Sequence, residues 1–207
     1  MSSENRPPER KRRSFIEEAR RAQIVEAAAR VVAEAGYANA SLARIAERAD
    51  ISKSVITYHF SGKDEILRSV VSGFFERAWA HMEGRISAEP TALGQVRAWI
   101  GAQLEYFDEH RTEFLAVIEI VGGHRTADGS LAFAAEMAEE VDGLAEILAR
   151  GQRDGEFRAF DPRTVANIIL RCADGVLGSW TTNDAVDLPA QSAALLDFID
   201  HAIRSGP

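Results

Sequence analysis

The chain has 207 residues, of which 46% are hydrophobic and 27% charged, and its formal net charge is −8 at pH 7. This composition is typical of a soluble globular protein with one or two domains. The single cysteine, Cys172, excludes an internal disulfide framework and indicates a reducing cytoplasm. The N-terminal residues lack the apolar core of a secretory signal, and no apolar stretch approaches the roughly 18 residues that would span a bilayer.

The charges are unevenly distributed along the chain. Residues 1–63 hold 12 Lys and Arg against 8 Asp and Glu, a net of +4, whereas residues 64–207 hold 12 against 24, a net of −12. A basic N-terminal third on an acidic body indicates that one end of the protein contacts a polyanion. The acidic body limits non-specific binding along DNA.

The N-terminal segment predicts an arm followed by a helix. Residues 1–13 are polar and include a basic run, so we expect a flexible basic arm that either reaches a DNA groove or backbone or stays solvated. Ser14 and Glu17 have the spacing of a capping box, which predicts a first helix beginning near Phe15. Its apolar positions recur at helical spacing as far as Gly36, a residue suited to end a helix.

Two short amphipathic helices are predicted between Ser41 and Lys63. In the first, Ser41 is the expected N-cap, and the buried stripe consists of Leu42, Ile45, Ala46 and Ala49. In the second, Ser52 is the expected N-cap, and Ile56 and Phe60 form a buried i, i+4 pair. Two helices of about two turns with so short a connection form a helix-turn-helix.

The outward side of the second helix supplies the candidate DNA contacts. Lys53, Ser54 and Thr57 are candidates for base contacts in a major groove, with Val55 available for a thymine methyl group. Phosphate contacts are predicted for a second group of side chains: Arg44, Tyr58, His59 and Lys63. The full predicted DNA-binding set is Arg44, Ser52, Lys53, Ser54, Val55, Thr57, Tyr58, His59 and Lys63.

This segment resembles the DNA-binding domain of the tetracycline-repressor (TetR) family of bacterial transcriptional regulators. The resemblance runs from about Ala22 to Leu67 and is most specific in the run 58–60, Tyr-His-Phe, which is followed by Lys63 and an acidic pair. Other matching positions are Ile24, Ala28, Gly36, Ser41, Ile45, Ala46, Ala49, Ile51 and Ser52. The family often has Gly, Thr and Tyr where this chain has Ser54, Val55 and Thr57, so the resemblance carries no base preferences.

The resemblance implies an all-α chain of about nine helices. We expect an N-terminal three-helix, helix-turn-helix DNA-binding domain over residues 14–63 and a C-terminal helical ligand-binding and dimerisation domain over 64–207. A long helix from residue 61 or 62 to about 86 would link the two. Further helices are predicted over about 91–107, 111–121 and 130–153, with a loop between Gly122 and Gly129.

In this family the ligand pocket lies among the middle helices of the second domain. That domain is rich in aromatic residues, which are candidates for an apolar pocket wall and equally for ordinary core. The predicted ligand-binding residues are Phe74, Trp79, Phe107, His110 and Phe133.

The last two helices carry apolar residues on more than one face. Asp161 and Pro162 are expected to open the first of them, as N-cap and first helical residue. A helix with two apolar faces must be covered twice, which predicts a four-helix interface between two copies of the chain, as the family resemblance also implies. The alternative is a helix packed inside one chain and weakened by its glycines. The predicted dimer interface is Val176, Leu177, Gly178, Trp180, Leu195, Ile199 and Ile203.

Motifs for catalysis and metal binding are missing from the sequence. The five histidines are widely spread without an HExxH pattern, and there is no GxSxG elbow, P-loop or dinucleotide fingerprint. We therefore predict no enzyme activity, no cofactor and no metal site.

The sequence thus predicts a ligand-responsive transcriptional regulator of the bacterial cytoplasm, associated with the chromosome. We expect a repressor that binds an inverted-repeat operator in double-stranded DNA as a homodimer and is released by a small-molecule effector. The alternative is a constitutive architectural DNA-binding dimer without an effector. No motif reveals the effector, the operator sequence or the direction of regulation.

Overall fold

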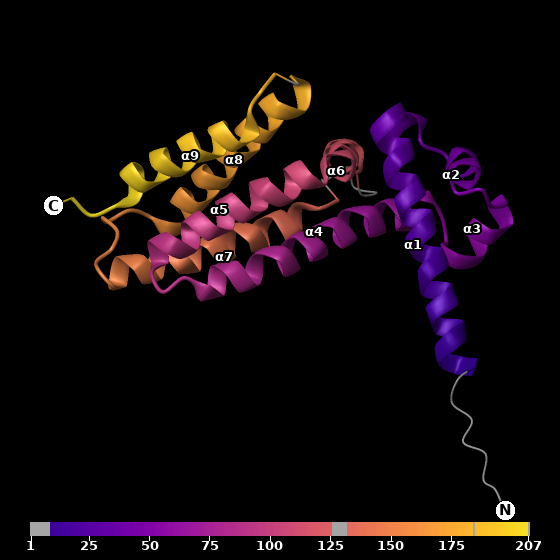
Figure 1. The fold of residues 1–207 in the computed structure, drawn as a ribbon, viewed down its shortest axis with the longest axis horizontal. Helices are drawn as coiled ribbons and strands as arrows, with labels where there is room; N and C mark the ends of the chain where they lie inside the picture. Colours follow the sequence, from indigo (N-terminus) through magenta and orange to yellow (C-terminus); the bar gives the residue numbers. More distant parts are fainter. Residues whose placement is uncertain (1–8, 126–131, 184, 207) are drawn as a thin grey trace, which may run out of the picture. The chain divides into compact units, whose positions relative to one another are not determined.

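The computed structural model describes residues 9–125, 132–183 and 185–206, which form helices joined by short connections (Figure 1). Within these ranges the elements are α1 (Glu9–Ala35), a 3-10 turn η1 (Tyr37–Asn39), α2 (Leu42–Arg48), α3 (Lys53–His59), α4 (Lys63–Ala88), α5 (Ala92–Glu109), α6 (Arg111–Gly123), α7 (Ala134–Arg153), α8 (Pro162–Thr182) and α9 (Leu188–Ile203). The predicted all-α class is confirmed.

The chain divides into two compact units. The first comprises Met1–Phe74 and Thr112–His124, and the second comprises Phe75–Arg111 and Arg125–Pro207. The predicted boundary between residues 63 and 64 differs from this division, because the first part of α4 and nearly all of α6 pack with the N-terminal helices.

The first helix starts earlier than the capping box predicts. It begins at Glu9 rather than near Phe15, so residues 9–13 are helical instead of belonging to a flexible arm. Glutamate, arginine and lysine, which make up residues 9–13, are strong helix formers. The rest of the predicted arm, residues 1–8, lies outside the described residues.

The first unit has a small apolar core between three helices. Ile24 of α1, Ile45 of α2 and Ile56 of α3 are fully buried. α1 ends as predicted at Gly36, whose φ of +79° is a conformation that other residues rarely adopt. The predicted N-cap of α2 is confirmed, since Ser41 Oγ accepts a hydrogen bond from the Arg44 amide at 3.3 Å.

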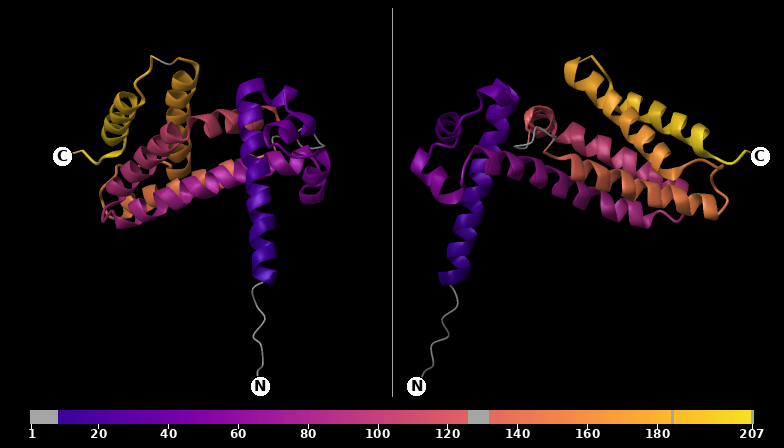
Figure 2. Two further views of the ribbon diagram at one scale, coloured as in Figure 1. Left: turned by 45° about the vertical axis from the view of Figure 1, so that its right-hand side comes forward. Right: turned by 180° about the vertical axis from the view of Figure 1, so that it is seen from behind.

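In the second unit, α5 lies between α7 and α9 (Figures 1 and 2). Its Gly101 approaches Leu196 of α9, and its Trp99 ring lies against Gly143 of α7. α8 opens as predicted: Asp161 Oδ1 accepts from the Thr164 amide at 2.7 Å, and Pro162 is the first helical residue.

Two predicted boundaries in the middle of the chain changed. Gly122 and Gly123 belong to α6 rather than to a loop, because glycine tolerates a helical backbone although it lowers its stability. Residues 126–131, which include the predicted start of the next helix at residue 130, lie outside the described residues, and α7 begins at Ala134.

Candidate nucleic-acid interface

The α3 helix separates its buried and exposed sides as the sequence predicts. Ile56 and Phe60 are buried in the first unit, which holds the helix in place. Lys53, Ser54 and Thr57 are exposed on the other side, and so is Tyr58, with 71% of its surface accessible. The predicted base-contacting side chains therefore project from a helix whose inner face is buried.

The turn between α2 and α3 has a special backbone conformation. Asp50 has a φ of +50°, which a short polar side chain tolerates better than most, and the Ile51 amide donates to the Ala46 carbonyl at 3.0 Å. Ser52 stands at the predicted N-cap position of α3, but its hydroxyl pairs with the Ser54 hydroxyl at 2.8 Å instead of an amide. This turn sets the direction in which α3 leaves α2.

The polar atoms on the outward side keep bonding capacity for a ligand. The Thr57 hydroxyl donates to the Ser54 carbonyl at 3.1 Å, which leaves its oxygen able to accept. Lys53 has no hydrogen bond or ion pair with any described residue, so its ammonium group is available. Arg44 is exposed at the start of α2, and its guanidinium donates to the Asn39 carbonyl at 3.4 Å.

Two of the predicted phosphate contacts also act inside the unit. Lys63 is half-buried at the start of α4, where its ammonium donates to the Tyr37 carbonyl at 3.0 Å and lies 4.7 Å from the centre of the Tyr37 ring. The His59 carbonyl accepts from Arg21, and the His59 ring meets Tyr58 edge-on. Lys63 is thus an internal contact of η1 as well as a candidate phosphate ligand.

The end of α3 is fastened to the start of α4 by a charged cluster. Arg21 lies 3.9 Å from the centre of the Phe60 ring and pairs with Glu65 at 2.9 Å. The Ser61 amide donates to Glu65 at 2.7 Å, and this bond, with the Arg21 contact, lowers the pKa of Glu65 to about 2. The cluster holds α3 at its C-terminal end.

Sequence reasoning missed a contact between α6 and the turn that precedes α2. The Tyr37 hydroxyl lies 3.0 Å from Nδ1 of the buried His124, and the Tyr37 amide donates to Glu119 at 3.4 Å. A Cβ atom on Gly123 would lie 2.7 Å from the Tyr37 ring, so glycine is required there. Because 87 positions separate Tyr37 from His124, no local pattern could have revealed the pair.

The predicted ligand-binding residues are divided between the two units. Phe74 is fully buried in the first unit against Phe114, whereas the other four belong to the second unit. There Phe107 and Phe133 are buried, His110 stacks on the Tyr106 ring with centroids 4.0 Å apart, and Trp79 remains 45% exposed. These positions are therefore core for the most part, and Trp79 is the accessible one.

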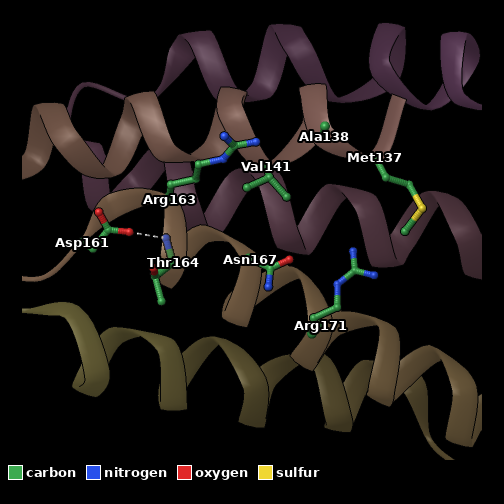
Figure 3. Close-up of a pocket in the computed structure, with 8 residues that line it drawn as sticks. All are labelled: Met137, Ala138, Val141, Asp161, Arg163, Thr164, Asn167 and Arg171. Carbon is green, nitrogen blue, oxygen red and sulfur yellow. Dashed lines mark hydrogen bonds between the residues drawn. The ribbon is translucent and has the colours of Figure 1, made fainter. Parts of the chain in front are cut away.

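An open hollow of about 480 Å³ lies between α7 and α8 (Figure 3). Its lining contains none of the predicted ligand-binding residues and consists of Met137, Ala138, Val141, Asp161, Arg163, Thr164, Asn167 and Arg171. Figure 3 shows the Asp161 carboxylate turned to the start of α8, where it serves as the helix cap. Both arginines pair with aspartates, Arg163 with Asp142 at 3.1 Å and Arg171 with Asp174 at 2.8 Å.

A second polar contact that sequence reasoning missed lies between α5 and α7. Gln103 is buried and donates through Nε2 to Glu140 at 2.8 Å. Burial raises the pKa of Glu140, and the charge of Asp174 on α8 raises it further. A glutamine at an otherwise apolar helix position is the one sequence signal that could have indicated this pair.

The predicted dimer interface needs correction. Five of its seven residues are buried by their own chain and leave little surface for a partner: Leu177, Trp180, Leu195, Ile199 and Ile203. The spacing correctly gave two apolar faces on α8 and α9, but one face of each helix packs inside the protomer. Val176 and Gly178 stay accessible, and the large apolar side chains left exposed on these helices are Ile168, at 50%, and Phe198, at 59%.

Two further features, a metal site and a membrane-spanning helix, are missing from the described residues. Those residues contain no group of three or more His, Cys, Asp or Glu side chains that could hold a metal ion. None of their helices combines the length and the apolar character that crossing a membrane requires.

Comparison with known proteins agrees with the helix-turn-helix geometry. Residues 24–70 match the family model "Bacterial regulatory proteins, tetR family". The fatty acid metabolism regulator protein of Bacillus subtilis is 25% identical over 190 residues, which cover 88% of this chain and 95% of that protein. The HTH-type transcriptional regulator BetI of Burkholderia ambifaria is 31% identical over 91 residues, 44% of this chain and 47% of that protein.

A solved structure shows that the likeness extends to the whole fold. The fatty acid degradation regulator FadR from Bacillus halodurans superposes with a TM-score of 0.76 over 88% of this chain and 98% of that one, at 22% sequence identity. The family match therefore coincides with the helix-turn-helix, and the shared fold continues through the second unit. Residues 24–70 thus carry the DNA-binding domain of the tetR family of bacterial regulatory proteins, on a chain that shares the fold of FadR.

Proposed function

We propose that this chain is a homodimeric repressor that binds an inverted-repeat operator and is released by a small-molecule effector. The observation that carries the proposal is the outward set on α3, because Lys53, Ser54 and Thr57 project from a helix anchored by Ile56 and Phe60. An exposed row of this kind suits base edges in a major groove. The basic charge of residues 1–63 suits the phosphates on either side.

Dimerisation is supported by the apolar side chains that α8 and α9 leave exposed. Ile168 on α8 and Phe198 on α9 are large apolar residues in accessible positions, with small residues such as Gly175 and Ala194 nearby on the same helices. A C2 dimer uses the same patch on both chains and would place the two recognition helices in equivalent positions. Two equivalent heads select an inverted repeat with half-sites about one helical turn or a multiple apart.

Control by a small molecule is supported by the size and content of the second unit and by one relative. The protein from Bacillus subtilis that matches 88% of this chain is named a fatty acid metabolism regulator. By analogy, we propose that a metabolite controls DNA binding by this chain and that the second unit binds this metabolite. A constitutive architectural dimer remains the competing function, and it predicts DNA binding that no metabolite changes.

Selection of double-stranded DNA from a random pool by the purified full-length chain tests the proposal. We expect an inverted repeat, protected in two equivalent halves in footprinting. At a base pair that Lys53 contacts directly, Lys53→Ala should change the free-energy difference between preferred and other bases by about 1–3 kcal/mol. Arg30→Ala is the matched control, because Arg30 is exposed on α1 and pairs with Glu26. Failure to enrich any repeated sequence would refute operator recognition.

A further inference from the structure

We propose that the second unit binds an effector with a protonated amine and an apolar tail, and that the amine is held by Gln103 of α5 and Glu140 of α7. This inference rests on the proposed function, since it names the chemical class of the effector. It is carried by the pairing of these two helices and by buried polar atoms that lack partners in the described part of the chain.

The two helices face each other at two successive levels. At one level the Trp99 ring of α5 lies against Gly143 of α7, where a Cβ atom would be 3.0 Å from the ring. About one turn later on α5 and one turn earlier on α7, Gln103 Nε2 donates to Glu140 Oε1 at 2.8 Å. Both levels belong to one seam between α5 and α7, in which Trp99 and Gln103 are buried.

This seam contains polar atoms that no described residue satisfies. Gln103 is only 7% exposed, yet its Oε1 accepts no hydrogen bond from any described residue. That oxygen is bonded to the same carbon as the nitrogen that donates to Glu140, so both acceptors belong to one amide–carboxylate pair. The Trp99 indole N–H is also buried without a partner. Unsatisfied buried groups of this kind cost free energy and call for a ligand or water.

The charge of the seam selects the kind of ligand. Glu140 forms no salt bridge with a described cation. Two charges of α8 act on it from a greater distance: Asp174 raises its pKa, and Arg171, which pairs with Asp174 at 2.8 Å, lowers it by a smaller amount. An ammonium group brings several donors and a positive charge, and can therefore bond to both Gln103 Oε1 and Glu140. A ligand carboxylate would meet a like charge and two acceptors, so the seam disfavours a free fatty acid head group.

Aromatic side chains beside the seam suit the apolar part of the ligand. Trp79 of α4 is 45% exposed and meets Trp99 edge-on, with ring centroids 5.3 Å apart. One turn earlier on α4, Phe75 is 39% exposed and meets Phe107 of α5. These rings offer apolar area for a hydrocarbon tail, and the indole faces attract a cation.

Isothermal titration of the full-length protein with decylamine and with decanoate tests the inference, because the two probes share a similar tail and differ in head-group charge. We expect decylamine to bind at least about tenfold more tightly than decanoate. Glu140→Gln should abolish this preference. Glu139→Gln, a change on an exposed neighbour in the same helix, should retain it.

The unmodified protein gives the first decision. If it binds decanoate as tightly as decylamine or more tightly, or does not bind decylamine, the inference is wrong. A preference that survives Glu140→Gln would also overturn it. Operator release is measured separately. If decylamine binds through Glu140 but leaves operator affinity unchanged, the amine site stands and the proposed effector response fails.

Discussion

Phe198→Ala should dissociate the proposed dimer. Phe198 is 59% exposed on α9. A phenylalanine offers about 200 Å² of surface, so a partner that covers the ring removes about 120 Å² from water. At about 25 cal/mol per Å² this contributes about 3 kcal/mol, of which alanine keeps about a third.

A C2 interface contains the residue twice, so the variant loses about 4 kcal/mol of association free energy, or about a thousandfold in the dimer Kd. Sedimentation equilibrium over a wide concentration range measures that constant directly. Ile118→Ala is the control, because Ile118 is similarly exposed, at 40%, but lies on α6 rather than on α8 or α9. A Phe198→Ala protein with the parental dimer Kd would refute the placement of the interface.

Three further predictions concern buried and charged contacts. Tyr37→Phe removes the hydroxyl bonded to His124 and should lower the free energy of unfolding in urea by about 1 kcal/mol, whereas Tyr58→Phe, on an exposed ring, should leave it unchanged. Glu65 has a lowered pKa, so its carboxylate stabilises the fold above pH 4.5, and this stabilisation is lost as the pH falls toward 2. Glu65→Gln should therefore lower the free energy of unfolding at pH 7 but not at pH 2. Glu140 has a raised pKa, so stability falls as the pH rises above 4.5; Glu140→Gln should unfold at a higher temperature than the parent at pH 7, and the gap should close below pH 4.5.

The helix-turn-helix could be predicted from the sequence because its determinants are local. The Ser41 cap acts within one turn, and the pair Ile56 and Phe60 identifies the buried side of α3 by spacing alone. Once that side is buried, geometry decides which side chains face outward. The start of α1 was harder to predict, since the charged residues 9–13 suit a helix as well as a solvated arm.

The chain's own sequence thus determined its helices and the polar face of α3. Only the tertiary structure decided which apolar faces are buried within the protomer: Leu177 and Ile199 are buried in their own chain, whereas Phe198 stays exposed. Periodicity identifies an apolar face but not its neighbour, because hydrophobic burial has no direction and any apolar surface can cover any other. The bond between Gln103 and Glu140 was likewise invisible, since the residues lie 37 positions apart and meet only when α5 packs on α7.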